Sequence, residues 1–543
     1  MKKTITISIL TLCFHVLYSQ TTYKYWVGFT DKKNNGYSVG DPSAYLSSRA
    51  IERRNKQTVA IDDLDLPVTK SYTDSLQKLG FAIQGVSKWM NGAIVSTNDS
   101  VLIDTLQKTS FVKETVLCAR YVLKNKKDTL SGTKTFKYCS SPAGYGLSRR
   151  QIEMLNGHCI HQMGYRGEGR IIAVLDGGFS KVNTLPAFDS LRRSSRIIAT
   201  RDFVNPSRDF YATITHGMQV LSLIGGNVRD TLIGTAPKAE FVLVITEDGE
   251  TEFPVEEYLW SMGAEYADSL GADVISSSLG YSDFDDKAMD HTYKDMNGET
   301  TPCAKAAAIA VSRGMVVVCS AGNEGGSSWR YISTPGDAKD ILTIGAVDSF
   351  RNSVYFSSHG PSSDGRVKPD ICAMGYNSYI QLQTGSYGRG SGTSFSAPIA
   401  AGMVTCLWQA FPDKSNRDIM DAVRRSAHLY YQPDTLYGYG IPDFDKAYSL
   451  LKKWPLPVNS PDELSIFPNP FRDHIVIDFY SFISEPFTIE AYGTWGRKNY
   501  SASVPAINNT YVMIDGLEGL PRGTVIFKII FATKTITYKC VKI

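Results

Sequence analysis

A serine in a glycine-rich segment is the first candidate for chemistry in this chain. Residues 390–398 read Gly-Ser-Gly-Thr-Ser-Phe-Ser-Ala-Pro, and the small apolar residues after them predict a helix packed against a sheet. A serine at the start of such a helix has an exposed hydroxyl and an outward N–H, and the helix dipole favours a developing negative charge there. Most serines in such loops form turns or cap helices, so Ser394 needs a base and an acid elsewhere in the chain.

Three further residues supply the groups that a nucleophilic serine requires. Asp176 follows the apolar run 171–175, which predicts a buried parallel strand. His216 stands before an apolar helical pattern, and Asn323 follows the apolar run 316–319 in a glycine-rich turn. Catalytic groups collect at the C-terminal ends of such strands. Taken alone, each residue has an ordinary interpretation as a turn or capping residue.

The order Asp, His, Asn, Ser resembles the subtilisin-like serine proteases. The motifs that carry the resemblance are VLDGGF, THGMQV, SAGNEG and GTSFSAP, within roughly residues 145–450. The resemblance implies that Ser394 attacks the peptide carbonyl, that His216 transfers its proton, and that Asp176 orients the imidazole. It also implies that Asn323 and the backbone N–H of the serine form an oxyanion hole.

Two positions depart from residues that are common in this family. Met218 stands two residues after His216, where many members have threonine. Gly177 and Gly178 follow Asp176, where many members have serine or threonine and then glycine. Neither position supplies a proton or a charge, so the catalytic assignment is kept. We expect these departures to change the shape of the pocket or its local rigidity.

The resemblance also implies substrate-binding segments. Ser278, Leu279 and Gly280 follow a predicted strand and resemble the family's substrate-lining segment, to which an extended peptide adds by main-chain hydrogen bonds. Glu324 directly follows Asn323, where the family's chain borders the primary specificity pocket. A carboxylate there would favour lysine or arginine, or disfavour acids, before the scissile bond. An exposed turn glutamate without influence is an equally open interpretation.

Strand and helix patterns alternate through the part of the chain that holds these motifs. The predicted strands are 241–245, 272–276 and 314–319, and the predicted helices are 255–270 and 302–313. This alternation predicts an α/β fold with a doubly wound parallel sheet, which is the subtilisin-like architecture that the resemblance implies. We assign residues 141–453 to this protease domain.

The N-terminal stretch predicts an exported protein. Two lysines precede an apolar segment from Ile5 to about Tyr18, and Ser19 stands before the expected cut. This pattern is typical of a secretory signal peptide over residues 1–19, because the apolar segment is too short for a membrane span and basic at its start.

Residues 20–140 predict an α+β domain ahead of the protease motifs. A strand-like run covers 23–29, and a charged helical stretch covers 44–56 with Ser43 as its N-cap. In secreted proteases of this family the position holds a propeptide. Such a segment can assist the folding of a slow parallel sheet and block the cleft until it is cut.

The segment 124–137 is polar and rich in lysine, which is typical of an exposed linker. We expect self-processing between about Lys134 and Tyr145, which would make residues 20–140 an inhibitor and folding aid. A permanent N-terminal domain is the second interpretation.

The chain changes character after residue 453. Residues 454–461 are rich in proline and predict an extended, semi-rigid linker. Residues 462–543 carry short alternating runs that predict a small antiparallel β-sandwich. The expected strands are 474–479, 487–492, 525–530 and 535–543.

This last domain resembles the C-terminal sorting domains of the Bacteroidetes type IX secretion system. The segments that carry the resemblance are 466–470, 492–497, 517–523 and the basic end 539–543. The run Thr524-Val525-Ile526 departs from the Val-Tyr that is common there. The resemblance implies the secretion machinery as a partner and a secreted or cell-surface location. A substrate-binding or adhesive β-module is the alternative.

Composition and charge narrow the remaining function classes. The net charge is +3 with 20% charged residues, which gives no nucleic-acid signature. The nine cysteines include no CxxC pair, so we predict neither a zinc site nor a disulfide scaffold, and expect Cys319 and Cys406 to be buried small hydrophobes. Catalysis of the implied kind requires no cofactor. A structural calcium ion is expected from the resemblance alone, since Asp283, Asp285 and Asp286 predict a solvated loop.

Together these predictions describe a secreted serine endopeptidase made as a zymogen, with protein or peptide substrates and its own propeptide as partners. The alternative from another class is a subtilisin-fold binding or adhesion protein whose catalysis is incidental or lost. All four catalytic positions are filled, which favours the enzyme.

Overall fold

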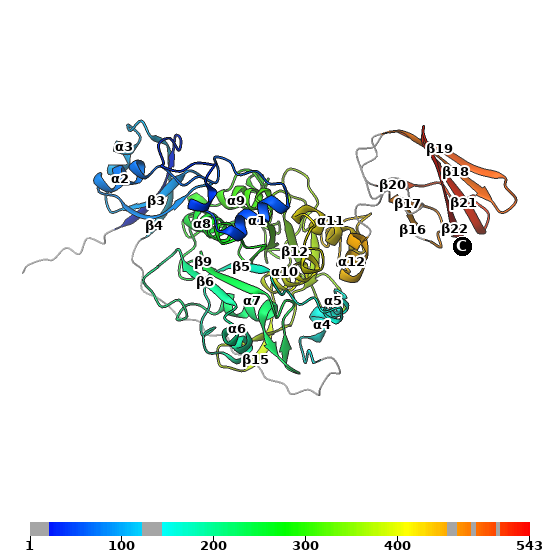
Figure 1. Cartoon of the computed structure of the whole chain (residues 1–543), viewed down its shortest axis with the longest axis horizontal. Helices are drawn as coiled ribbons and strands as arrows, with labels where there is room; N and C mark the ends of the chain where they lie inside the picture. The colour runs from blue at the N-terminus through cyan, green and yellow to red at the C-terminus, as the bar shows by residue number, and fades with distance from the viewer. Residues whose placement is uncertain (1–20, 122–143, 453–463, 468, 479–484, 506–510) are drawn as a thin grey trace, which may run out of the picture. The chain divides into compact units, whose positions relative to one another are not determined.

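The computed structural model describes residues 21–121, 144–452, 464–467, 469–478, 485–505 and 511–543 (Figure 1). The predicted signal peptide, the lysine-rich segment and the proline-rich linker lie outside the described residues, as does Pro468. The chain forms two compact units, Met1–Ala447 and Tyr448–Ile543, so the boundary falls within a helix, α12 (Phe444–Lys452).

A parallel sheet of seven strands forms the centre of the first unit, in the order β13-β12-β11-β10-β5-β9-β6. These strands are β5 (Ile171–Asp176), β6 (Ile197–Asp202), β9 (Glu240–Ile245), β10 (Val274–Ser277), β11 (Val316–Ser320), β12 (Leu342–Val347) and β13 (Ile371–Met374). All but β6 are buried along nearly their whole length, as parallel strands covered on both faces must be. The predicted parallel sheet is therefore confirmed.

Helices cover both faces of this sheet (Figure 1). The main ones are α7 (His216–Gly225), α8 (Val255–Leu270), α9 (Pro302–Ser312), α10 (Thr393–Ala410) and α11 (Asn416–Ser426). Gly263 of α8 meets Leu175 and Val244, whereas α7 meets Asp176 and Phe241. Successive side chains of a strand point to opposite faces, so α7 and α8 lie on opposite faces of the sheet. Helices α10 and α9 pack with α7 and α8 respectively.

Smaller elements complete the first unit around this sheet. They are α4 (Arg149–Glu153), α5 (Gly157–Gln162), α6 (Asp189–Arg193), β7 (Asn227–Val228), β8 (Leu232–Ile233), β14 (Ser378–Gln381) and β15 (Tyr387–Gly390). The antiparallel pair β14–β15 leads directly into α10. Cys319 and Cys406 are both buried and free, which confirms their predicted packing role.

The N-terminal domain holds an antiparallel sheet in the order β2-β3-β1-β4. Its strands and sheet-side helices are β1 (Thr22–Phe29), β2 (Ala82–Ser87), β3 (Gly92–Thr97), β4 (Val112–Tyr121), α2 (Lys70–Lys78) and α3 (Leu102–Leu106). Val27 and Phe29 pack with Leu76 and Phe81 in a core of this domain's own. Trp26 points to the other face and packs against α8.

The predicted helix of this domain begins later than expected. It is α1 (Ser48–Lys56), and Ser47 rather than Ser43 caps it, because the Ser47 hydroxyl accepts the Ala50 N–H at 3.1 Å. Ser43 instead belongs to a separate 3-10 turn that begins at Pro42. Proline at the first position of that turn lacks an N–H and is suited to start it, which sets the turn apart from α1.

The second unit is a β-sandwich, as predicted. One sheet has the order β16-β17-β20 and the other β19-β18-β21-β22. The strands are β16 (Ser465–Phe467), β17 (Ile475–Asp478), β18 (Phe487–Gly493), β19 (Lys498–Val504), β20 (Tyr511–Ile514), β21 (Gly523–Ile530) and β22 (Thr535–Lys542). Ile477 and Ile514 of the first sheet share one apolar core with Ile489 and Phe527 of the second. The alternating pattern did not predict β16, β19 or β20.

Candidate active site

Asp176 and His216 meet at the C-terminal edge of the central sheet. Asp176 ends β5 and is fully buried, and His216 begins α7 with its side chain about one-third exposed. The His216 Nδ1 lies 2.8 Å from Asp176 Oδ1, which also accepts the Gly177 N–H at 2.8 Å. A Cβ on Gly217 would lie 2.6 Å from the Gly178 carbonyl oxygen, so glycine after the histidine permits this close approach of α7 to β5.

The electrostatics of this pair raise the pKa of the His216 imidazole. Burial alone would lower the pKa of His216, but the charge of Asp176 and the hydrogen bond to it outweigh burial and raise that pKa above its ordinary value. An aspartate in this position fixes one tautomer of the ring and stabilises the imidazolium. The pair can therefore accept a proton from a neighbouring hydroxyl and hold it.

Ser394 lies in the first turn of α10, on the same cavity as His216. Its Oγ donates to the Ser278 carbonyl at 3.2 Å, and the Ser278 Oγ donates back to the Ser394 carbonyl at 2.8 Å. The ring of the next residue, Phe395, is centred 6.3 Å from the His216 ring. Ser394, His216 and Asn323 line one cavity of about 220 Å³.

Asn323 is oriented by the residue that precedes the serine. Its Oδ1 accepts the Thr393 N–H at 2.8 Å and the Thr393 hydroxyl at 3.1 Å. Because these donors hold the oxygen, the Nδ2 amide is turned to the cavity that Asn323 lines. Gly322 before it has φ +106° and no room for a Cβ, which would lie 2.4 Å from Ser333 Oγ.

The predicted substrate-binding residues border the same cavity. Ser278, Leu279 and Gly280 follow β10 and line the cavity, as does Glu324. The Glu324 carboxylate accepts the Ser358 hydroxyl at 3.0 Å, so the side chain is half-buried and turned inward rather than exposed in a turn. The structure thus brings every predicted site residue except Asp176 to one cavity, and the buried Asp176 joins the site through its contact with His216. The roles of these residues in the reaction stay predictions.

Glu247 is a cavity residue that sequence reasoning missed. It follows β9, the strand beside β5, and Tyr281 donates its hydroxyl to Glu247 Oε2 at 3.4 Å. Burial and then the charge of Asp176 raise the pKa of Glu247 to about 7. The signal that could have found it is its position at the C-terminal end of a strand adjacent to the one that carries Asp176.

Nothing in the described residues assigns a metal. Within the described ranges no group of three or more His, Cys, Asp or Glu side chains could hold a metal ion. Asp286 accepts the Ala288 N–H and pairs with Arg120, so its carboxylate has partners of its own. The structural calcium ion therefore stays a prediction, and no ligands are assigned to it.

Across the same ranges, no helix has the length and apolar character needed to cross a membrane.

Comparisons with known proteins place this site in context. A model described as the Subtilase family matches residues 167–440, about half of the chain and the part that holds Asp176, His216, Asn323 and Ser394. A model described as the Peptidase S8 propeptide domain, Bacteroidota, matches residues 24–133.

Individual relatives match this chain over 304 to 379 residues. Subtilisin E of Bacillus subtilis is 26% identical over 379 residues, which cover 68% of this chain and 83% of that protein. Subtilisin of Bacillus pumilus is 27% identical over 305 residues, covering 55% and 95%. Serine protease AprX of Bacillus subtilis is 30% identical over 304 residues, covering 50% and 65%.

Proposed function

The chain belongs to the subtilase family of serine endopeptidases, and on that premise we propose that it hydrolyses peptide bonds through Asp176, His216 and Ser394. The observation that carries the proposal is the 2.8 Å contact between His216 Nδ1 and Asp176 Oδ1 on the cavity that Ser394 lines. A serine hydroxyl is a weak nucleophile until an adjacent base takes its proton.

The steps follow from the positions of these groups. The imidazole of His216 takes the proton of Ser394 as the hydroxyl attacks the substrate carbonyl, and later gives it to the leaving amine. Asp176 stabilises the imidazolium between the two steps. The oxyanion forms beside the Ser394 N–H and Asn323 Nδ2, whose orientation Thr393 fixes before the substrate arrives.

An active-site probe tests the assignment. A fluorophosphonate should label the wild-type protein and should fail to label Ser394→Ala. Ser391→Ala is the matched control, because Ser391 lies exposed in the same glycine-rich segment and should leave labelling unchanged. Labelling that survives Ser394→Ala, or an unlabelled wild type, would remove the proposal and favour a binding or adhesion protein.

The protein would be made as a zymogen that cuts itself. The match of residues 24–133 to a Bacteroidota propeptide model supports this, and the expected cut falls between about Lys134 and Tyr145. Ser394→Ala should accumulate as the uncut chain, and the intact mass of the wild-type product should locate the cut. Efficient cutting of the Ser394→Ala chain in its own host would point to another protease.

Glu324 would favour a basic side chain before the scissile bond. Glu324 lines the cavity, and the groups that donate to its carboxylate, Ser358 and Ser333, are uncharged hydroxyls. Peptides with Arg, Leu or Glu at that position should be cut in this order of rate by the wild type. Glu324→Gln should narrow the difference, whereas identical profiles would contradict a role for Glu324.

The C-terminal β-sandwich would direct export. A contact of Asn469 supports the resemblance to type IX sorting domains. Its Oδ1 accepts the Val541 N–H at 2.8 Å and so joins the segments 466–470 and 539–543, two of those on which the resemblance is based. Deletion of residues 460–543 should leave the protein in the periplasm. Normal export with weaker substrate binding would instead identify a substrate-binding module.

A further inference from the structure

The N-terminal domain contacts the peptidase domain over the sheet and over a separate helix. On the sheet, Trp26 stacks on Tyr258 of α8 with ring centres 4.5 Å apart, inside an apolar cluster that includes Met262. Glu265 of the same helix accepts the backbone N–H groups of Lys88 and Trp89 at 2.8 and 3.1 Å. Helix α1 makes a second set of contacts, which meets the first at Asp268, a partner of both Arg54 and Lys88.

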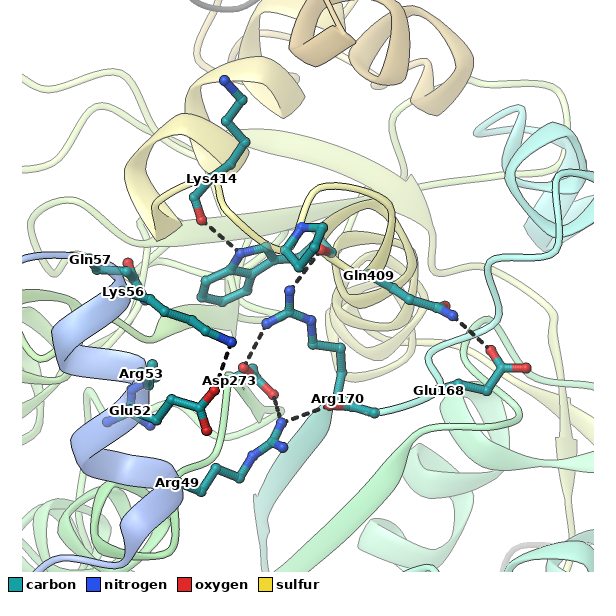
Figure 2. Close-up of a pocket in the computed structure, with 13 residues that line it drawn as sticks. Arg49, Glu52, Arg53, Lys56, Gln57, Glu168, Arg170, Asp273, Gln409 and Lys414 are labelled. Carbon is teal, nitrogen blue, oxygen red and sulfur yellow. Dashed lines mark hydrogen bonds and ion pairs between the residues drawn. The ribbon is translucent and has the colours of Figure 1, made fainter.

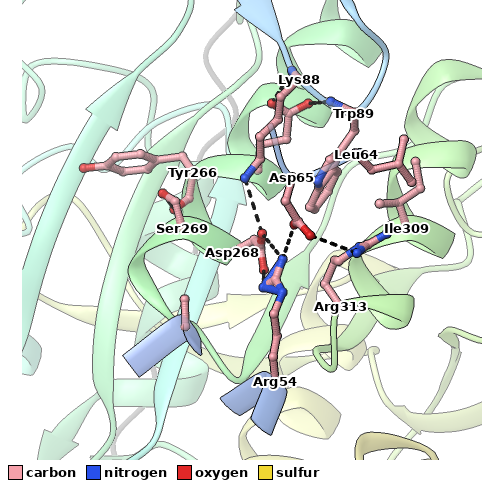
Figure 3. Close-up of polar contacts among 12 residues, drawn as sticks. Arg54, Leu64, Asp65, Lys88, Trp89, Tyr266, Asp268, Ser269, Ile309 and Arg313 are labelled. Carbon is pink, nitrogen blue, oxygen red and sulfur yellow. Dashed lines mark hydrogen bonds and ion pairs between the residues drawn. The ribbon is translucent and has the colours of Figure 1, made fainter. Parts of the chain in front are cut away.

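The first part of that set is a buried charge network (Figure 3). Arg54 of α1 has no exposed surface, and its guanidinium donates to Asp268 of α8 at 3.0 and 3.1 Å. Arg53 donates to the same carboxylate at 2.5 Å. Asp65 of the N-terminal domain pairs with Arg54 and accepts from Arg313, at the end of α9, at 3.0 Å. The network thus crosses between the two domains at Arg54–Asp268 and again at Asp65–Arg313.

The peptidase side of this network depends on the N-terminal domain for its partners. Among the described residues, Asp268 pairs with Arg53, Arg54 and Lys88, all from the N-terminal domain. The charged partners of Arg313 likewise come from the N-terminal domain. A buried charge that loses its partners is strongly destabilised, so the network resists any partial separation of the two domains.

The second part of the set lies along the start of the central sheet (Figure 2). Arg49 of α1 donates to Asp273 at 2.7 Å and to the Gly169 and Gly271 carbonyls at 2.8 and 3.1 Å. Gln57 donates to the Gly314 carbonyl at 2.8 Å and accepts from the backbone of α11. These contacts lie just before β5, β10 and β11, whereas Asp176 and Asn323 lie at the opposite ends of β5 and β11.

The catalytic cavity is consequently free of the described N-terminal domain. Every residue that lines the cavity comes from Gly177 or later in the chain. The contacts that hold α1 do not compete with a substrate for Ser394 or its neighbours. A substrate can therefore reach this cavity while the described part of the N-terminal domain stays bound to the peptidase domain.

We propose that the N-terminal domain stays on the peptidase domain after the chain is cut between them, as a second chain of the active enzyme, and that α1 holds it there. This proposal rests on the proposed function, because it concerns where the N-terminal domain stays once the chain has cut itself. On the peptidase domain, the interface is formed by Asp268, Asp273 and Arg313. On the N-terminal domain, it is formed by the arginines of α1 together with Asp62 and Asp65.

Retention can be measured without self-processing. In full-length Ser394→Ala, a recognition site for a sequence-specific foreign protease would replace part of residues 122–143, and the chain would be cut there. The two fragments should then elute as one complex from a gel-filtration column at about micromolar concentration. Separation of the fragments under these conditions would overturn the proposal.

Variants of α1 test which contacts hold the domain. Arg53→Met with Arg54→Met should speed dissociation of the cut complex by at least roughly 30-fold, since truncating one side of a buried charge pair across an interface acts mainly on the off-rate. Lys56→Met is the matched control on the same helix, because Lys56 pairs within α1, with Glu52, and should leave the rate unchanged. Equal rates for both variants would show that α1 is not the anchor.

The wild-type product tests whether the two-chain form is active. The fluorophosphonate probe should label the peak that contains both fragments. Label confined to a peak without the N-terminal fragment would overturn the proposal. A product without any label would contradict the proposed function, while retention in the cut Ser394→Ala protein would still decide the role of α1.

Discussion

The orientation of Asn323 gives a prediction with a graded series of variants. Asn323→Ala removes the Nδ2 donor from the cavity that Ser394 lines. Thr393→Val keeps the asparagine but removes the hydroxyl that lies 3.1 Å from its Oδ1 and that also accepts the Gly322 N–H at 3.2 Å. The 2.8 Å bond from the Thr393 N–H to Asn323 stays. Thr393→Ser retains both bonds and is the matched control.

The expected losses differ because the contacts differ. Loss of the donor should lower kcat by about 100- to 1,000-fold, or about 2.7–4 kcal/mol, a range that comes from subtilisin. Loss of one neutral hydrogen bond out of the two that orient Asn323 is worth about 0.5–1.5 kcal/mol, which corresponds to about 2- to 13-fold in kcat. Thr393→Ser should stay within about 2-fold of the wild type.

Steady-state kinetics on a neutral peptide amide measure this series. KM should stay nearly constant, because the oxyanion exists in the transition state and not in the bound substrate. An Asn323→Ala variant that loses activity through KM alone would refute the oxyanion assignment. Equal losses for Thr393→Val and Asn323→Ala would refute the argument that the two hydrogen bonds share the orientation of Asn323.

Two further predictions concern residues around the pair of Asp and His. Glu247→Gln removes a carboxyl whose charge, present above its own pKa of about 7, helps to raise the pKa of His216, so the base form of the ring persists to lower pH. The rising limb of kcat/KM, measured between about pH 5 and 9, should move to lower pH, and an unmoved limb would contradict the coupling. Gly178→Ala should destabilise the protein by about 1–3 kcal/mol, because its Cβ would lie 2.7 Å from the backbone N and O of Ile214. Gly177→Ala should lower the free energy of unfolding by less, since its Cβ meets the end of the flexible Ile214 side chain. Both variants would be made in the Ser394→Ala protein, and equal midpoints of their denaturant unfolding would contradict this difference.

Local pattern was sufficient for several elements of the peptidase domain. The predicted helix 255–270 is α8 with the same bounds, and the strand that ends at Asp176 was placed to within one residue. These elements are long or strongly apolar, so their periodicity follows from residues a few positions apart. The N-cap of α1 was placed at Ser43 rather than Ser47, since two nearby serines give the same local signal and only the hydrogen bond to Ala50 distinguishes them.

The sequence by itself indicated the class of fold and the family, and it predicted Asp176, His216, Asn323 and Ser394 as the catalytic residues. Only the tertiary structure decided that Glu247 lines the same cavity as His216, Asn323 and Ser394, and that Arg54 pairs with Asp268, 214 residues further along the chain. The physical reason is that backbone propensity and hydrophobic period act between near neighbours. Contacts between side chains on different elements depend on how whole helices and strands pack, which local pattern does not specify.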